Sequence, residues 1–120
     1  MRVLIADDHR LFGQALEAVL TGESEFEVVG YARDGREAVQ LATELHPDVT
    51  LMDLSMPVLD GVEATREIRK SIPDACVLML TGSNSQVDID RARKAGAAGY
   101  VTKDQIAGDL VRAILDAASS

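Results

Sequence analysis

Short apolar runs alternate five times with segments of helical spacing in this chain, and this alternation constrains its fold more than any other feature. The apolar, β-favouring runs cover residues 3–7, 27–32, 48–53, 75–81 and 98–103. Three of them consist almost entirely of Val, Leu, Ile, Met and Ala, as expected of strands covered on both faces. The pattern predicts βαβ units, that is, an α/β fold with a five-stranded parallel sheet and helices on both of its faces.

The segments between these runs carry apolar residues three and four positions apart, which is the spacing of an amphipathic helix. Asp60 is a candidate N-cap of the third helix and Asp104 of the fifth, which is expected over residues 105–118. Gly96 is expected to close the fourth helix. The apolar positions of the first four helices are Leu11, Ala15, Leu16 and Val19; Ala38, Leu41, Ala42 and Leu45; Val62, Thr65 and Ile68; Val87, Ile89, Ala92 and Ala95.

The fifth helical segment carries two apolar stripes. The stripe that can face the sheet consists of Ile106, Leu110, Ile114 and Ala117. A second stripe, rotated by about one residue, consists of Val111, Leu115 and Ala118. Two interpretations stay open: the helix has one wide buried face, or the second stripe is covered by another subunit or domain.

Length and composition restrict the possible functions. The 120 residues fit one domain, and the net charge of −8 argues against nucleic-acid binding by this segment, because phosphate contacts need a basic surface. Cys76 is the single cysteine, so a disulfide framework is excluded, and its apolar neighbours favour a small core residue. The first apolar run is too short for a signal peptide, and no run approaches the ~20 apolar residues of a membrane span. A cytoplasmic location is therefore expected.

Polar side chains stand at the ends of four predicted strands. Asp7 and Asp8 end the first strand, Asp53 the third, Thr81 the fourth and Lys103 the fifth. Open parallel sheets bind ligands outside the carboxyl ends of their strands, so these five side chains are expected to meet in one site.

Three clustered carboxylates repel one another, by about 4 kcal/mol per pair at a separation of ~4 Å and an effective dielectric of ~20. A hard cation relieves this repulsion, and oxygen ligands suit Mg²⁺. One carboxylate can then attack a phosphoryl group and form an aspartyl phosphate. The cation and the lysine would balance charge on the transferred oxygens, which is most of what phosphoryl transfer requires.

Four motifs, in this order, resemble those of response-regulator receiver domains. They are Asp7-Asp8, residues 53–61 (DLSMPVLDG), Leu80-Thr81-Gly82 and residues 99–104 (GYVTKD). The resemblance covers nearly the whole chain, and the ordered set is specific although each motif alone is common. The DDH sequence at 7–9 and AGAAGY at 95–100 are similar to the NarL/FixJ/LuxR subfamily, which usually carries a C-terminal helix-turn-helix. The resemblance implies a flavodoxin-like, doubly wound (βα)₅ fold with strand order 2-1-3-4-5.

The resemblance also implies which residues carry the chemistry. Asp53 would accept a phosphoryl group from a sensor histidine kinase. Mg²⁺ would be bound by Asp8, Asp53 and the backbone carbonyl of Ser55, and Asp7 would act through water. The domain would assist only its own phosphorylation and dephosphorylation, and it would not be an enzyme in the ordinary sense.

Three further residues are implied to sense the phosphoryl group. Lys103 would pair with its oxygens, Thr81 would move to hydrogen-bond it, and Tyr100 would swing inward behind Thr81. The surface that changes would be that of the fourth helix, fifth strand and fifth helix, or that of the first and fifth helices. A phosphorylation-dependent homodimer is expected, with the second stripe of the fifth helix as a candidate surface.

Some positions depart from the family pattern or allow a second interpretation. Ser55 and Ser83 occupy the two positions thought to tune phosphate lifetime, and Gly82 stands where Ala is common. Asp104 follows the lysine where many members have a proline joined by a cis bond, so the peptide geometry there stays open. Gly13 replaces a larger residue in the first helix. His9 is interpreted as a solvated residue at the helix start in preference to a metal ligand or a catalytic group.

Two other functions fit parts of the pattern. A phosphatase of haloacid-dehalogenase type also uses a strand-ending Asp and Mg²⁺, but it usually has a second Asp where Ser55 stands. A flavin-binding module would have a Ser/Thr/Gly-rich loop after the first strand, where this chain has Asp-Asp-His. Residues 1–118 are expected to form the receiver domain, and residues 119–120 to start a tail or linker. A DNA-binding domain is expected outside this chain, and a stand-alone receiver is the alternative.

Overall fold

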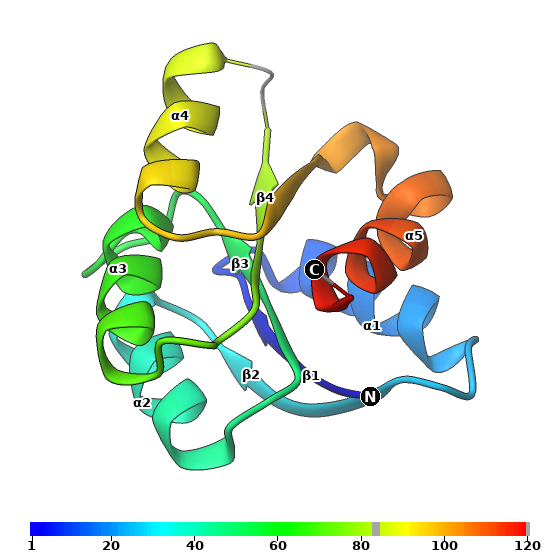
Figure 1. Ribbon diagram of the computed structural model, residues 1–120. Coiled ribbons are helices and arrows are strands. Elements are labelled where there is room, and N and C mark those ends of the chain that lie inside the picture. The colour runs from blue at the N-terminus through cyan, green and yellow to red at the C-terminus, as the bar shows by residue number, and fades with distance from the viewer. Residues whose placement is uncertain (83–84, 120) are drawn as a thin grey trace.

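Five parallel strands form one sheet in the order β2-β1-β3-β4-β5, which confirms the predicted fold (Figure 1). The computed structural model describes residues 1–82 and 85–119. The strands are β1 (Arg2–Ala6), β2 (Glu27–Ala32), β3 (Val49–Asp53), β4 (Val77–Thr81) and β5 (Gly99–Thr102). Every predicted strand is present, with its ends shifted by two residues at most, because flanking residues continue the apolar pattern without joining the ladder.

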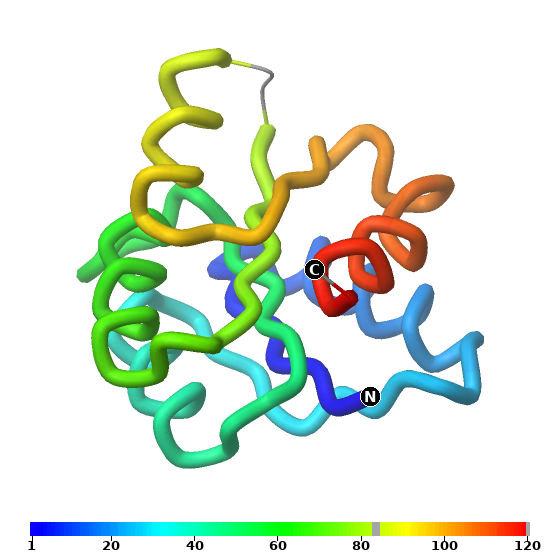
Figure 2. The backbone as a smooth tube through the Cα atoms, viewed as in Figure 1, coloured from blue at the N-terminus to red at the C-terminus, as the bar shows by residue number. Residues whose placement is uncertain are grey.

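Helices cover both faces of the sheet, α1 and α5 on one face and α2, α3 and α4 on the other (Figure 1). They are α1 (Arg10–Thr21), α2 (Gly35–Leu45), α3 (Gly61–Ser71), α4 (Gln86–Lys94) and α5 (Ile106–Ala118), and a 3₁₀ turn η1 (Lys103–Gln105) precedes α5. The backbone trace passes from strand to helix and back around the central sheet (Figure 2). None of the helices in the described part of the chain has the length and apolarity needed to cross a bilayer.

The helix ends show where local sequence signals succeed and where one fails. Asp60 caps α3 by accepting a hydrogen bond from the backbone N–H of Glu63 at 2.9 Å, as predicted. Gly96 follows α4 with φ of 104°, a left-handed conformation that favours glycine. The predicted cap at Asp104 is wrong: the N-cap of α5 is Gln105, which makes no side-chain capping bond. The backbone already turns in η1, so Asp104 lies inside that turn and does not occupy the extended position of a cap.

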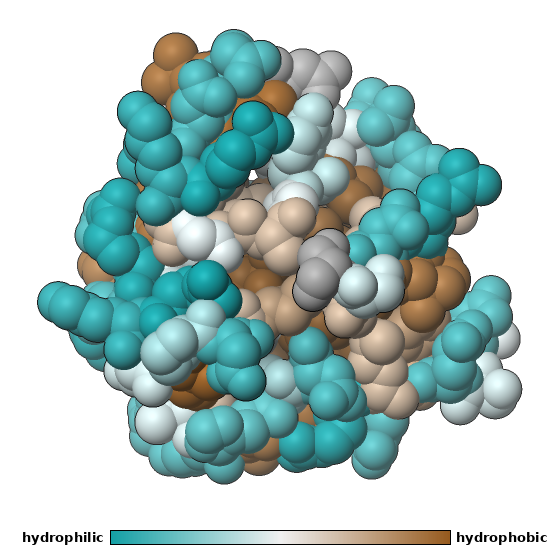
Figure 3. Space-filling view, viewed as in Figure 1, coloured by the Kyte–Doolittle hydropathy of each residue, from teal (hydrophilic) through white to brown (hydrophobic). Residues whose placement is uncertain are grey.

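The sheet separates two apolar clusters, one under α1 and α5 and the other under α2, α3 and α4. In α5 the predicted inner stripe is buried: Ile106, Leu110, Ile114 and Ala117. The second stripe is not, because Leu115 is 40% exposed, Ala118 is exposed and Val111 is only partly buried. One wide buried face is therefore the wrong interpretation of α5, and hydrophobic atoms reach the surface over this helix (Figure 3).

A glycine in α1 makes room for a tyrosine of β2. A Cβ atom added at Gly13 would lie 1.0 Å from the hydroxyl oxygen of Tyr31, so no larger residue fits while Tyr31 lies across the helix. The hydroxyl is buried without a hydrogen-bond partner among the described residues. Burial raises the pKa of Tyr31, and the nearby charge of Asp7 raises it further.

Candidate functional site

Three aspartates meet at the carboxyl edge of the sheet. Asp7 follows β1 and is 1% exposed, and Asp53 ends β3 and is 2% exposed. The Asp8 side chain, the next along the chain, is 30% exposed. Strands β1 and β3 pair directly, so their ends bring Asp7 and Asp53 together from positions 46 residues apart (53 minus 7). The site thus consists of two buried acids and one accessible acid.

A glycine at position 61 lets the loop after β3 pack closely against Asp53. The backbone N–H of Gly61, the first residue of α3, donates to the carbonyl of Leu54 at 2.9 Å. A Cβ atom at Gly61 would lie 2.0 Å from the carbonyl oxygen of Asp53, so only glycine allows this close approach. The backbone N–H of Ser55 donates to Oδ1 of Asp53 at 3.4 Å. The loop therefore holds Asp53 at the edge of the sheet with its other oxygen, Oδ2, toward the site.

Lys103 brings the positive charge of the site. Its Nζ atom lies 3.3 Å from Oδ2 of Asp53 and 3.7 Å from Oδ2 of Asp7. The same atom lies 4.5 Å from the centre of the Phe12 ring, so the ammonium group is positioned against an aromatic face as well as between two acids. One ammonium group pairs with two buried carboxylates, so the net charge of these three groups is negative when both acids are ionised.

The pKa of Asp53 is raised to about 6 in this environment. Burial is the main cause, because it disfavours the charged carboxylate, and repulsion by Asp7 adds to it. The charge of Lys103 and the N–H of Ser55 act in the opposite direction without cancelling the effect. The site therefore lacks positive charge when all its acids are ionised.

A cavity of about 280 Å³ opens onto Asp53. Its lining residues are His9, Asp53, Leu54, Ser55, Thr81, Gly82, Asp88 and Lys103. Thr81 comes from the end of β4 and is buried, while Gly82 is exposed. A Cβ atom at Gly82 would meet nothing within 4 Å, so the wall of the cavity is open on that side.

The donor atoms of the site fit a divalent cation. One ligand atom from each of Asp7, Asp8, His9 and Asp53 lies within 4.8 Å of all the others. Oδ2 of Asp7 is buried and accepts no hydrogen bond from the described residues. An unsatisfied buried carboxylate oxygen beside two further carboxylates is the oxygen-rich environment that Mg²⁺ prefers.

The order and spacing of these residues match a known family. The family model described as "Response regulator receiver domain" matches residues 3–115. The chain belongs to this family. Membership favours the receiver hypothesis over the phosphatase and the flavin-binding module, since neither of those is a receiver domain.

Relatives of this receiver domain include transcriptional regulators. It is 40% identical over 114 residues to the transcriptional regulatory protein DegU of Brevibacillus brevis, covering 95% of this chain and 48% of the relative. It is 41% identical over 114 residues to the response regulator protein VraR of Staphylococcus aureus, covering 95% and 54%. The receiver domain thus spans about half the length of the curated relatives it matches.

Solved structures agree with the fold. The signal receiver domain of the response regulator NarL from Mycobacterium tuberculosis superimposes with a TM-score of 0.94 at 34% identity, covering 99% of this chain and 96% of that chain. A LuxR-family two-component response regulator from Aurantimonas sp. gives a TM-score of 0.94 at 35% identity, covering 98% and 84%. Both similarities confirm the predicted resemblance to the NarL/LuxR type.

Not all predicted site residues of the receiver domain lie in the site. Tyr100 on β5 is 42% exposed and lines shallow cavities beside α4 and α5, not the cavity of Asp53. Ser83 lies outside the described residues. The peptide bonds of the described residues are all trans, including the bond between Lys103 and Asp104. His9 starts α1 with a 65% exposed side chain, as predicted, but its ring also faces the acids, which the sequence did not indicate.

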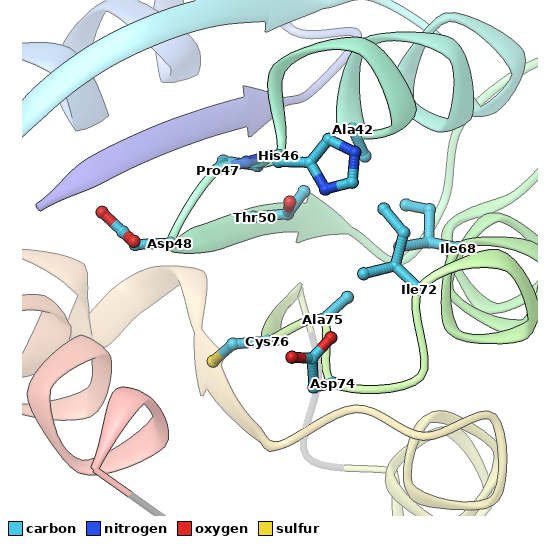
Figure 4. A pocket seen from close by; sticks show the side chains of 10 residues that line it. All are labelled: Ala42, His46, Pro47, Asp48, Thr50, Ile68, Ile72, Asp74, Ala75 and Cys76. Carbon is cyan, nitrogen blue, oxygen red and sulfur yellow. The ribbon is translucent and has the colours of Figure 1, made fainter.

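Another cavity, of about 300 Å³, lies at the opposite edge of the sheet between α2 and α3. Its polar side chains include His46, Asp48 and Asp74, which are spread around the rim and do not converge (Figure 4). The residues that the structure describes form no second cluster of metal-binding side chains there. The chemistry of the receiver domain is therefore concentrated at the carboxyl edge.

Proposed function

We propose that this receiver domain is a phosphoacceptor switch of a two-component system, and that Asp53 accepts the phosphoryl group from a sensor histidine kinase. The observation that carries the proposal is the 3.3 Å contact between Lys103 Nζ and Asp53 Oδ2 at an open cavity. A nucleophilic carboxylate with a cation beside it is what transfer to an aspartate requires, because negative charge accumulates on the phosphoryl oxygens.

In the proposed reaction an oxygen of Asp53 attacks the phosphorus of a phosphohistidine. The new O–P bond forms as the P–N bond breaks, and the electron pair of that bond stays on the imidazole nitrogen of the kinase. Lys103 would remain paired with the oxygens of the transferred group. Because the cavity is open beside Gly82, a partner's imidazole can approach without displacing a side chain at that position.

Mg²⁺ is the proposed cofactor. Asp8, Asp53 and the backbone carbonyl of Ser55 would bind it, with Asp7 acting through water. When bound, it supplies positive charge that offsets the carboxylates and the phosphoryl oxygens. The three clustered carboxylates support this assignment, because burial and the charge of Asp7 raise the pKa of Asp53 in the metal-free site, and a bound cation would offset both effects.

The output of the switch would be a change of surface. Thr81, buried beside Asp53, would hydrogen-bond the phosphoryl group, and the exposed ring of Tyr100 would turn inward behind it. The shift would alter the α4-β5-α5 surface or the α1-α5 surface and favour a homodimer. The half-length match to DegU and VraR supports an attached transcriptional output domain that contacts DNA, whereas a stand-alone receiver would act through protein binding alone. A cytoplasmic location belongs to the same proposal.

Small residues around the acceptor are proposed to keep the phosphorylated state accessible to water. Ser55 is exposed, and Gly82 has open space where a side chain would stand. Water can therefore reach the acyl phosphate from this side, and we expect Gly82→Val to slow its hydrolysis.

The acceptor is tested by adding a small acyl phosphate and Mg²⁺ to the 120-residue chain and measuring intact mass. We expect one phosphoryl group on the wild type, none on Asp53→Asn and one on Asp74→Asn, which changes an acid at the far cavity. Labelling of Asp53→Asn at the wild-type rate would overturn the assignment. A wild type that stays unlabelled would overturn the proposed function as a whole.

A further inference from the structure

The imidazole of His9 lies at the mouth of the acidic cluster. Its Nδ1 atom is 3.1 Å from Oδ1 of Asp8, 3.4 Å from Oδ1 of Asp7 and 3.7 Å from Oδ2 of Asp53. Among the described side chains within this cluster it offers the one nitrogen that can carry a free electron pair, because the Lys103 ammonium only donates. The ring reaches the acids from the solvent side, so no core packing prevents it from adjusting by a few tenths of an ångström.

A backbone contact holds the histidine in this place. The backbone N–H of His9 donates to Oδ1 of Asp7 at 2.7 Å, and this bond fixes the N-cap residue of α1. The same carboxylate keeps its Oδ2 atom buried, with no hydrogen bond from the described residues and with Lys103 Nζ at 3.7 Å. The buried acid thus positions the imidazole with one oxygen and leaves the other oxygen unsatisfied in the site.

The distances between the candidate ligand atoms suit a single metal ion. Octahedral coordination with bonds of about 2.1 Å places neighbouring ligand atoms about 3 Å apart and opposite ones about 4 Å apart. The four candidate ligand atoms of Asp7, Asp8, His9 and Asp53 lie within 4.8 Å of one another, so small shifts bring all of them around one ion. Imidazole suits later transition-metal ions such as Ni²⁺ and Zn²⁺, and affinity rises along the series from Mn²⁺ through Co²⁺, whereas Mg²⁺ favours oxygen ligands.

We propose that His9 contributes Nδ1 as a ligand to the cation site, so that this chain favours borderline transition-metal ions over Mg²⁺ more than its carboxylates alone would. The inference rests on the proposed function in placing a cation beside Asp8 and Asp53. The neutral imidazole would coordinate through Nδ1 and keep its proton on Nε2. A nitrogen ligand changes which ion fills the site, and it leaves the phosphoacceptor role of Asp53 as it stands.

The test compares the wild type with His9→Asn and His46→Asn, which apply the same substitution to the two histidines of the chain. Asparagine keeps a good N-cap at position 9 and tolerates the left-handed conformation of residue 46. The affinities for Mg²⁺ and Co²⁺ are measured at pH 8, and electron spin-echo spectra of bound Mn²⁺ report directly coordinated imidazole ¹⁴N.

We expect the ¹⁴N coupling in the wild type and in His46→Asn and its loss in His9→Asn. The preference for Co²⁺ over Mg²⁺ should fall about tenfold or more in His9→Asn, the scale on which altered metal-site partners act. An unchanged ¹⁴N coupling or an unchanged Co²⁺ to Mg²⁺ ratio in His9→Asn would overturn the inference. Asp53→Asn tests the cation site of the proposed function separately from the role of His9. If this variant binds Mg²⁺, Co²⁺ and Mn²⁺ as the wild type does, the proposed cation site is wrong. If it binds them more weakly, the cation site stands and the His9→Asn results decide the role of His9.

Discussion

The ammonium group of Lys103 lies over the ring of Phe12, with 4.5 Å between Nζ and the ring centre. The two residues come from opposite ends of the chain, one in the first turn of α1 and the other directly after β5. Oδ2 of Asp53 is 3.3 Å from the same nitrogen, so the ring and the carboxylate both contact the ammonium group. Phe12 therefore belongs to the site through the lysine that it positions.

Replacing Phe12 by Leu should slow phosphorylation of Asp53 several-fold, because a contact of this kind contributes about 0.5–2 kcal/mol to the position of the ammonium group. Initial rates with a small acyl phosphate at saturating Mg²⁺ measure the effect. Phe26→Leu is the matched control, since Phe26 lies in the same apolar cluster without a contact to Lys103. Equal slowing in both variants would assign the effect to packing alone.

The raised pKa of Asp53 predicts that Asp53→Asn stabilises the metal-free protein. The unfolded chain releases this proton near pH 3.8 and the folded chain near pH 6, so the folded state loses stability as the pH rises through that window. Removing the ionisable group should raise the free energy of unfolding by about 1–3 kcal/mol at pH 7.5, and by clearly less at pH 4.5. Urea unfolding at the two pH values measures this, and an equal gain at both would contradict it.

Strain in the loop after β3 predicts a stabilising substitution. Val58 is 80% exposed and has φ of 69°, a left-handed conformation that a β-branched residue adopts only at a cost of about 1–2 kcal/mol. Val58→Gly should therefore raise the free energy of unfolding by about 0.5–1 kcal/mol after the greater flexibility of glycine is subtracted. Val87→Gly, at an exposed position inside α4, should lower it. Thermal unfolding of both variants measures whether each substitution raises or lowers stability. A loss of stability in both variants would argue against strain at residue 58.

Two helical glycines should respond oppositely to alanine. Gly13→Ala places a Cβ atom onto the Tyr31 hydroxyl and should cost about 1–3 kcal/mol of stability, whereas Gly108→Ala in α5 meets nothing within 4 Å and should gain about 1 kcal/mol. Tyr31→Val should remove much of the cost of Gly13→Ala. Denaturant unfolding of the single and double variants gives the coupling free energy between positions 13 and 31. Strictly additive changes in unfolding free energy would contradict the close contact between Gly13 and Tyr31.

Exposed apolar side chains on α5 and α4 allow a test of which surface the phosphorylated form uses to dimerise. Leu115→Glu should weaken the dimer if it forms through α1 and α5, and Val87→Glu if it forms through α4, β5 and α5. Sedimentation of each variant after full phosphorylation distinguishes these outcomes, because both side chains are exposed and neither change should unfold the domain. A wild type that remains monomeric after full phosphorylation contradicts dimerisation through either surface.

Much of the fold could be predicted because each strand is a run of apolar residues and each helix carries a regular stripe. The edge where Asp7, Asp53, Thr81 and Lys103 meet follows from the parallel topology alone. Positions decided by a single backbone or side-chain orientation could not be predicted. The turn at Asp104 begins earlier than its capping signal suggests. The ring of His9 faces the acids, and one oxygen of Asp7 accepts a hydrogen bond from the backbone N–H of the same histidine.

Contacts between residues far apart in the sequence could not be predicted from the apolar pattern either. Gly13 could be singled out as unusually small for its place in a helix, but nothing in the local sequence indicates that Tyr31 fills the space. Phe12 likewise fits the apolar face of α1, and its contact with Lys103 depends on how η1 turns away from β5. Such pairs are set by the packing of whole elements.

The division of the interior by the sheet has a consequence for how sequences of this kind can diversify. The cluster beneath α1 and α5 shares no residue with the one beneath α2, α3 and α4, so changes on one side have little effect on the packing of the other. A lineage can therefore rebuild the α5 surface for a new partner while it inherits the opposite half unchanged. The sheet edge with its aspartates, which both halves support, is the part that such drift leaves in place.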